Sequence, residues 1–236
     1  MIVAQATPSP SPPPPPATYV SAEDELSPGY YSEAGSSNQV NLRAQIPYGD
    51  SSTYYVRIKL PIVTSAPPEA ITGAGDLAVT NFAIFNPARP AWVGGLTFRF
   101  PTANDSLGTH KYSLGPALGY TVNLGRWTLG LSEESYFSVI GPSSYPSVGK
   151  SQLSPTLRLA LYNGWSIGFS TMQFTYDWVI NRWTDVPFGL RLEKHGIAGL
   201  ASLDAYADAE RNLVHTAETP GWTIRSAVRW YFTRFP

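Results

Sequence analysis

The sequence contains no cysteine, which excludes a disulfide framework and thiol chemistry and is consistent with a bacterial envelope protein. Charged residues make up only 14% of the chain, against the fraction of about a quarter that is usual in soluble domains. The 16 Lys and Arg nearly balance the 17 Asp and Glu, so no overall charge favours nucleic acid as a partner. No segment offers the roughly 20 consecutive apolar residues of a transmembrane helix. A membrane protein with this sequence must therefore be a β-barrel, because lipid tolerates no open sheet edge.

The amino terminus is proline-rich and differs from the rest of the chain. Ala4-Gln5-Ala6 matches the small-x-small pattern of a signal-peptidase site, although the charged and apolar parts of a signal peptide do not precede it. Residues 1–6 are therefore either a signal-peptide remnant or an accidental match. The proline run at 7–16 must be extended and cannot join a β-ladder. We expect a disordered tether over 7–21 and one barrel domain over 22–236.

From residue 38 onward the sequence reads as strand, turn and strand. In residues 38–47, for example, Val40, Leu42 and Ile46 alternate with polar residues. Alternation of this kind over segments of about ten residues, separated by turn residues, is typical of a transmembrane barrel. We predict eleven strands in this part of the chain, near 38–47, 53–63, 76–86, 91–100, 111–124, 127–138, 152–162, 165–178, 185–194, 197–208 and 221–235.

The connections between these strands alternate in length. Gly125-Arg126 is short, for example, whereas the connection over 101–110 is long. Bacterial barrels have short periplasmic turns and longer outer loops, so the two sets should lie at opposite ends. An outward-running strand must then precede 38–47, and we place it within 22–35. The predicted fold class is an all-β, antiparallel up-and-down transmembrane β-barrel of twelve strands, preceded by the disordered tail.

Two kinds of residue interrupt the strand pattern. Pro61, Pro116, Pro155 and Pro187 fall inside predicted strands, where each removes a ladder donor. We therefore expect these prolines at bulges or rims. The alternation in 165–178 is kept only if a bulge falls near Ser170-Thr171.

The seven tryptophans all lie near the ends of predicted strands, as interfacial girdles require. A soluble sandwich with tryptophan core anchors would place them mid-strand as often. We assign six to the membrane interface: Trp92, Trp127, Trp165, Trp178, Trp222 and Trp230.

The polar face of the strands supplies the candidate functional residues. On the predicted phases it holds eight basic and five acidic residues, which predicts a modest preference for anions carried chiefly by Arg225 and Arg229. The lumen-lining candidates are Arg43, Arg57, Lys59, Arg99, Arg158, Asp177, Arg191, Glu193, Asp204, Arg225 and Arg229.

Several stretches resemble one family of bacterial outer-membrane proteins. They are QIPY, VRIKLPIV, GDLAVTNFAIFNP, LTFRFPTANDSLGTHKYSLGPALGY, WTLG, TYDW and NRWTDVPFG, within residues 38–236. In these stretches the chain is similar to the family named for a meta-pathway of phenol degradation, whose members are described as transporters. The resemblance implies an outer-membrane barrel that moves small organic compounds, aromatic or hydrophobic ones among them. It carries over no catalytic residue.

We predict no enzyme, no catalytic residue, no metal site and no cofactor. His110 and Ser113 are close in sequence, but a rim histidine beside a strand start explains them better than a hydrolase pair does. The first hypothesis is a porin-like channel or uptake barrel for small solutes in the Gram-negative outer membrane. The alternatives are an outer-membrane lipid hydrolase and a non-conducting structural or anchoring barrel.

The expected partners follow from the first hypothesis. They are outer-membrane lipid, a small-molecule solute and the barrel-assembly machinery, with no nucleic acid. The aromatic carboxy-terminal strand, ending near Phe235, would be the signal that the assembly machinery reads.

Overall fold

The computed structural model describes residues 18–28, 36–49, 53–66, 71–86, 91–104, 107–197, 200, 202–214 and 220–232. Within these residues, no helix is long and apolar enough to cross a membrane. The strands are β1 (Thr18–Ser27), β2 (Ser37–Tyr48), β3 (Tyr54–Ser65), β4 (Gly73–Ala74), β5 (Leu77–Asn86), β6 (Ala91–Phe100), β7 (Tyr112–Leu124), β8 (Trp127–Ile140), β9 (Gly149–Ala160), β10 (Trp165–Phe169), β11 (Phe174–Asp177), β12 (Arg182–Asp185), β13 (Pro187–Lys194), β14 (Leu203–Asn212) and β15 (Trp222–Phe232).

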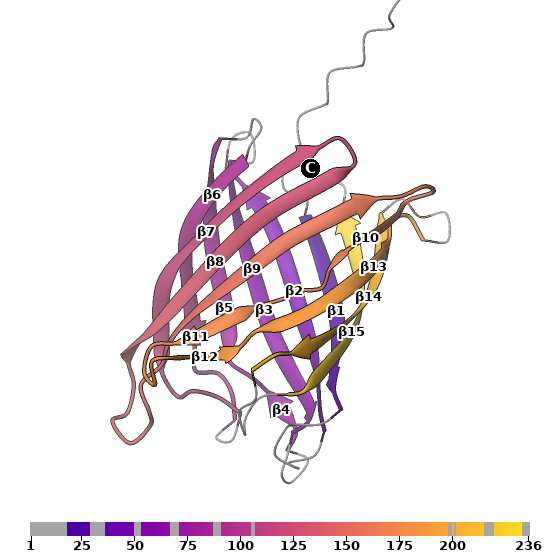
Figure 1. Cartoon of the computed structure of the whole chain (residues 1–236). Coiled ribbons are helices and arrows are strands. Elements are labelled where there is room, and N and C mark those ends of the chain that lie inside the picture. The colour runs from indigo at the N-terminus through magenta and orange to yellow at the C-terminus, as the bar shows by residue number, and fades with distance from the viewer. Residues whose placement is uncertain are drawn as a thin grey trace, which may run out of the picture.

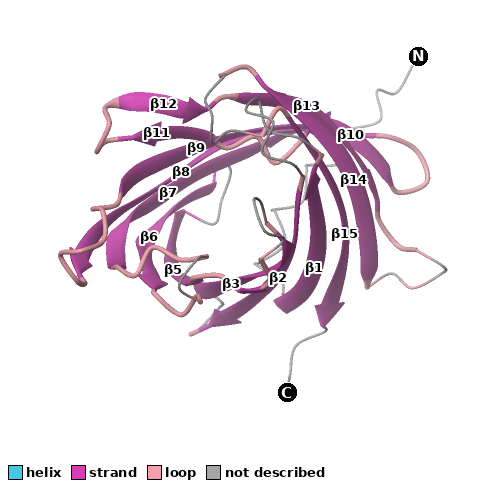
Figure 2. Cartoon of the chain, turned by 90° about the horizontal axis from the view of Figure 1, so that it is seen from below, coloured by secondary structure: helices cyan, strands magenta, loops and turns pink. Residues whose placement is uncertain are grey.

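The described strands form one closed antiparallel sheet. Most strands pair with their neighbours in the chain, and the exceptions are at β4 and at β10–β13, where β9 pairs with both β10 and β11, β10 with β13 and β11 with β12. Pairing of β1 with β15 and of β10 with β9 completes the ring (Figures 1 and 2). β10 and β11 continue one another along β9, β12 leads directly into β13, and β4 is a short addition beside β3. The wall is therefore a barrel of twelve strands, which confirms the predicted fold class.

Two strands lie away from their predicted positions, because β14 begins at Leu203 and ends at Asn212 instead of spanning 197–208, and the first strand is shifted as well. β1 begins at Thr18, so residues 18–21 belong to the barrel rather than to the tether, and the strand ends at Ser27 instead of lying within 22–35. Its alternation is present, with Val20 and Leu26 exposed and Glu23 buried. Because β1 carries three consecutive acidic residues, it reads as a polar loop when it is considered without its neighbours. Residues 1–17 and Phe235 lie outside the described residues.

Burial in this barrel is the reverse of that in a soluble protein. The described residues with the least exposure include Glu23, Asn41 and Thr97, each at 0%. Large apolar side chains such as Leu118 and Val228 are exposed on the outside. A carboxylate is rarely fully buried in a soluble domain unless it is paired. A polar interior inside an apolar outer band is the pattern of a barrel that faces lipid, and it argues against the soluble sandwich.

The wall is interrupted between β10 and β11, where the predicted bulge near Ser170-Thr171 is confirmed. β9 pairs with β10 through Arg158–Ala160 and with β11 through Lys150–Leu153, so residues 170–173 lie outside the ladder. The Leu161 N–H donates to Trp165 O at 2.7 Å, so the odd-numbered residues at this end of β9 direct their N–H groups toward β10 and β11. Proline has no backbone N–H to donate. On this side of Pro155 no strand lies opposite to accept such a bond, so the proline leaves no ladder hydrogen bond unmade.

The other strand prolines also lie at irregularities. Pairing between β7 and β8 is absent at Gly115 and Pro116. Pro187 is the first residue of β13. At Pro61, β3 exchanges β5 for the segment around β4, and the carbonyl of Pro61 accepts a hydrogen bond from Gly75 N at 2.8 Å. All four prolines therefore lie where strand pairing begins, is interrupted or changes partner, but no register shift marks a bulge at Pro61 or Pro116.

Connections of different length lie at opposite ends of the barrel. At the upper end in Figure 1, Gly125-Arg126 joins β7 to β8. At the same end, Asn163 and Gly164 have φ of 54° and 74°, and Trp165 N donates to Tyr162 O. These are the features of a type I′ turn, whose twist matches that of a hairpin. The longer connections, including 101–111 and 141–148, lie at the lower end, as the alternation of lengths predicts.

Candidate functional site in the barrel lumen

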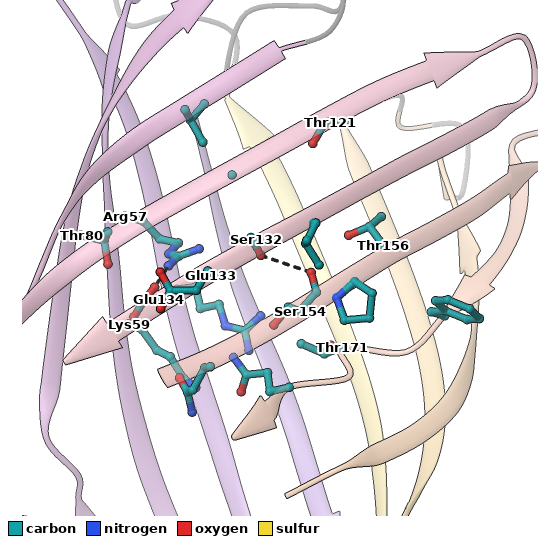
Figure 3. Close-up of a pocket in the computed structure, with 18 of the residues that line it drawn as sticks. Arg57, Lys59, Thr80, Thr121, Ser132, Glu133, Glu134, Ser154, Thr156 and Thr171 are labelled. Carbon is teal, nitrogen blue, oxygen red and sulfur yellow. Dashed lines mark hydrogen bonds and ion pairs between the residues drawn. The ribbon is translucent and has the colours of Figure 1, made fainter. Parts of the chain in front are cut away.

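The barrel encloses a cavity of about 610 Å³ that is bounded by β1–β3, β5–β10 and β13, together with residues of the connection between β10 and β11. Arg57, Lys59 and Glu134 meet on one side of it, and hydroxyl side chains such as Thr121 and Ser154 line other parts, together with aromatic and aliphatic residues (Figure 3). The strand alternation places these groups inside because their apolar neighbours in sequence point outward. The cavity is therefore polar and contains charges of both signs.

The predicted lumen-lining residues fall into two sets. Those that line the cavity are Arg43, Arg57, Lys59, Arg99, Arg158, Arg191 and Glu193. The others, Asp177, Asp204, Arg225 and Arg229, do not line this cavity but are paired in register with inward-facing residues of neighbouring strands. The chain thus gathers charged residues from strands far apart in sequence.

One group of inward-facing charges alternates in sign around the wall. Arg191 on β13 lies opposite Asp208 on β14, Asp208 lies opposite Arg225 on β15, and Arg225 lies opposite Glu25 on β1. We call these four residues the alternating row. Opposite charges at directly opposed positions stabilise neighbouring strands.

Arg225 is the centre of the alternating row. Its Nε donates to Glu25 Oε2 at 2.7 Å, and its two terminal nitrogens contact Asp208 Oδ1 at 3.3 Å and Glu210 Oε1 at 2.6 Å. Arg191 Nε donates to Asp208 Oδ2 at 2.9 Å, and Ser170 Oγ donates to Glu210 Oε2 at 2.9 Å. The three carboxylates therefore hold the Arg225 guanidinium in the wall of the barrel.

A second group of charges repeats the same sign. Arg43 on β2 lies directly opposite Lys59 on β3. On the other side of β3, Lys59 lies opposite Ala78 on β5, which in turn lies opposite Arg99 on β6. We call Arg43, Lys59 and Arg99 the basic row. Like charges at directly opposed positions destabilise a sheet.

Two carboxylates compensate the basic row in part. Arg43 forms an ion pair of 2.6 Å with Glu23, which also accepts hydrogen bonds from Asn41 and Tyr206. Arg99 is 3.9 Å from Glu134, which Arg57 binds more closely.

Arg99 is further held by neutral contacts. It donates to Gln152 Oε1 at 3.3 Å and stacks on Tyr136 at 3.4 Å from the ring centroid. Lys59 differs from both arginines, because its ammonium makes no hydrogen bond or ion pair with any described residue.

These contacts correct the predicted charge balance. Lys150 adds one positive charge to the inner face, while Glu23, Glu25 and Glu210 add three negative charges, so the expected surplus of three falls to one. Arg225 is compensated by three carboxylates, and Arg229 lies 3.7 Å from Glu193. The prediction that Arg225 and Arg229 chiefly carry an anion preference therefore loses its basis, because both are occupied within the wall.

A smaller cluster at the short-turn end was missed by sequence reasoning. Glu193, His195 and Asp204 bring one ligand atom each within 4.8 Å of one another, and His195 Nδ1 lies 2.8 Å from Asp204 Oδ2. The geometry could serve a cation, but Arg158 and Arg229 lie 3.3 and 3.7 Å from Glu193 and already balance it. The connection after β13 turns His195 back onto β14, and no spacing in the sequence signals this contact.

The residues considered for a hydrolase have other roles in this structure. The His110 ring stacks on the Tyr145 ring with centroids 3.9 Å apart, and His110 adopts a positive φ of 56° in the loop before β7. Ser113 is buried at the start of β7, in register with Arg99. The structure thus shows a loop histidine stacked on an aromatic ring and a buried serine in the wall.

The tryptophans predicted at the membrane interface lie on the outside of the wall. Trp92, Trp127, Trp165 and Trp230 lie near the short-turn end, and Trp178 and Trp222 lie near the other. All six are exposed, with fractions from 42% to 56%. This arrangement gives the outer surface two levels of aromatic rings, and their role as interfacial residues stays a prediction.

Comparison with solved structures identifies the fold. No protein-family model matches the chain, and no curated protein matches it. An outer membrane channel from Pseudomonas putida F1 is similar, with a TM-score of 0.63 and 15% identity over 97% of this chain and 100% of that chain. The KdgM porin in complex with disordered oligogalacturonate has a TM-score of 0.59, with 10% identity over 91% of this chain and 99% of that one. The NanC porin has a TM-score of 0.59, with 9% identity over 92% of this chain and 100% of that one. The fold is therefore that of outer-membrane channel barrels.

Proposed function

We propose that the protein is a channel or uptake barrel for small solutes in the bacterial outer membrane. The observation that carries this proposal is the combination of a closed barrel, an apolar outer surface and an internal charged cavity of about 610 Å³. A closed sheet of this kind leaves no open strand edge to face lipid, as a membrane-spanning barrel requires. A cavity of this volume is in the range that accommodates small molecules.

We infer that the solutes are small organic compounds and that no enzymatic step takes place. The resemblance of residues 38–236 to the phenol-degradation family supports this choice, and so does the fold shared with a porin solved in complex with oligogalacturonate. The cavity is lined by charged and hydroxyl-bearing side chains, which suit the passage of a polar or charged solute.

We also propose that outer-membrane lipid and the barrel-assembly machinery are partners. β15 closes the barrel, because it pairs with β14 on one side and with the first strand, β1, on the other. Assembly cannot close the wall without it. Deletion of residues 232–236 should therefore leave the protein in the periplasm or degraded, and normal membrane insertion of this truncation would contradict the proposal.

Planar-bilayer recording of the purified full-length protein tests the channel function. We expect discrete openings from protein that shows heat-modifiable migration on a gel, which is the mark of a folded barrel. Heat-modifiable protein that never opens would contradict a channel. Lipase activity that is lost on His110→Ala would instead favour the hydrolase alternative.

A further inference from the structure

We propose that Lys59, together with Arg43 and Arg99, forms an anion-binding subsite that receives the carboxylate of a small aromatic acid in transit. The inference rests on the proposed channel function, because it names the solute group that the lumen recognises. The three cations come from β2, β3 and β6, and all three line the cavity. Lys59 is visible beside Arg57 and Glu134 in Figure 3.

The first argument concerns the cost of the basic row. Arg43 and Lys59 occupy directly opposed positions on neighbouring strands, where like charges oppose pairing of the strands. The alternating row shows that the same barrel can place opposite charges at opposed positions. Glu23 and Glu25 act on Lys59 through space, but neither makes an ion pair with it. A site that breaks this rule and is compensated only in part is expected to have a function.

The second argument concerns the unused capacity of these groups. Arg43 is bound to Glu23, and Arg99 is held by Tyr136, Gln152 and the distant oxygen of Glu134. Lys59 has three ammonium donors and engages none of them with a described residue.

The Nε of Arg99 is a further donor beside this space. It is buried and has no hydrogen-bond partner among the described residues. An anion at Lys59 would receive charge-assisted hydrogen bonds, which are the stronger kind.

The third argument concerns the body of the ligand. Tyr55 and Phe82 stack at 4.8 Å between centroids on the same wall and line the same cavity. Arg57 lies over the Phe82 ring at 5.1 Å from its centroid. Phe82 is only 6% exposed, so Tyr55 is the more accessible ring of the pair. An aromatic ring beside cationic groups suits a solute with a flat apolar body and one negative group. Benzoate is therefore the probe that fits, and phenol and inorganic phosphate separate the contribution of the ring from that of the charge.

The main experiment compares Lys59→Gln with Lys194→Gln in planar bilayers. Both substitutions remove one positive charge, but Lys194 lies at the short-turn rim, where its ammonium binds Asn163 O. In the wild type we expect anion-selective openings that benzoate blocks. Block should be about tenfold weaker in Lys59→Gln, the equivalent of one lost charge-assisted bond, and unchanged in Lys194→Gln. Openings with equal benzoate block in wild type and Lys59→Gln would overturn the inference and leave the channel function intact.

Isothermal titration calorimetry of the protein in detergent measures benzoate binding directly, so it tests the subsite without requiring the channel to conduct. Absence of openings would contradict the channel function, while benzoate binding that Lys59→Gln removes would still support the subsite. No benzoate binding to folded wild type would overturn it. Phenol and phosphate should each bind more weakly than benzoate. Phenol binding as tight as that of benzoate would show recognition of the ring alone, and phosphate binding as tight would show recognition of the charge alone. Either outcome contradicts a site for an aromatic acid.

A second variant separates a functional lysine from a structural one. Lys59→Glu places a carboxylate opposite Arg43 and so restores the sign alternation of a stable row. We expect this variant to unfold at a higher temperature than the wild type and to lose the anion preference. A lower unfolding temperature would mean that Lys59 supports the fold, and the inference would then fail.

Discussion

The alternating row and the basic row occupy the same inner face, but the first alternates arginine with a carboxylate whereas the second contains cations alone. In the first, Arg225 is 11% exposed at its side chain and contacts three carboxylates. In the second, Lys59 lies opposite Arg43 on one side and Ala78 on the other, and it makes no hydrogen bond or ion pair with a described residue. The cross-strand order of the charges, rather than their number, therefore separates residues that hold the wall from residues that can bind a solute.

The largest effect is expected from breaking the alternating row at its centre. Arg225→Ala would leave Glu25, Asp208 and Glu210 facing one another without their shared cation. Loss of one partner from a buried ionic group typically costs about 3–5 kcal/mol. Urea unfolding of the protein reconstituted in lipid, followed by tryptophan fluorescence, should register a loss of this size or a failure to fold.

Arg225→Lys is the matched control for this prediction. It keeps the charge but not the three-way geometry of the guanidinium, so an intermediate loss is expected. If Arg225→Ala unfolds at the same urea concentration as the wild type, the alternating row does not stabilise the barrel.

A smaller loss is expected from Asp208→Asn. The amide keeps the shape of the carboxylate but no longer compensates Arg191 and Arg225, which both contact Asp208 in the wild type. Arg225 retains Glu25 and Glu210, so the loss should correspond to weakened charge-assisted bonds of about 1.5–3 kcal/mol. The same urea measurement checks it, and a cost as large as that of Arg225→Ala would show that Asp208, not Arg225, is the centre of the network.

The sequence was sufficient to predict the wall but not the pairing within it. Alternation with period two places Arg43, Lys59 and Arg99 on one face of their strands, and this needs no knowledge of neighbouring strands. Which side chains become neighbours depends on the stagger between strands, which the turns and bulges determine. The basic row therefore became visible only once Arg43 was paired with Lys59 and Ala78 with Arg99.

β1 illustrates the same limit more strongly. Its three consecutive acidic residues conceal the alternation, and its placement within 22–35 omitted the Thr18 end of the strand. Glu23 and Glu25 were consequently absent from the predicted inner face, although they bind Arg43 and Arg225. The contact of His195 with Asp204 was missed for a different reason, because it depends on the path of a loop and not on a strand period.

Removal of the Lys59 charge should stabilise the barrel, in contrast to the two substitutions in the alternating row. Lys59→Met keeps the length of the side chain and eliminates repulsion from Arg43, so the free energy of unfolding should increase by about 0.2–1 kcal/mol. The anion preference in bilayer recordings should decrease in the same variant. A decrease in stability would contradict the assignment of Lys59 to solute binding instead of wall support.

The smallest effect is expected at Lys150, a cation of the same wall that belongs to neither row. Lys150 is 38% exposed at its side chain and lies 3.9 Å from Asp177, near the long-loop end. Exposed ion pairs at such a distance contribute little, so Lys150→Gln should change the free energy of unfolding by no more than about 0.5 kcal/mol. It also removes one positive charge, as Lys59→Gln does, and this makes the pair a direct comparison in reversal-potential measurements. If selectivity depended on the total charge of the wall, both variants would shift the potential equally. We expect Lys59→Gln to shift it clearly and Lys150→Gln to leave it nearly unchanged, because only Lys59 faces the cavity without a partner among the described residues.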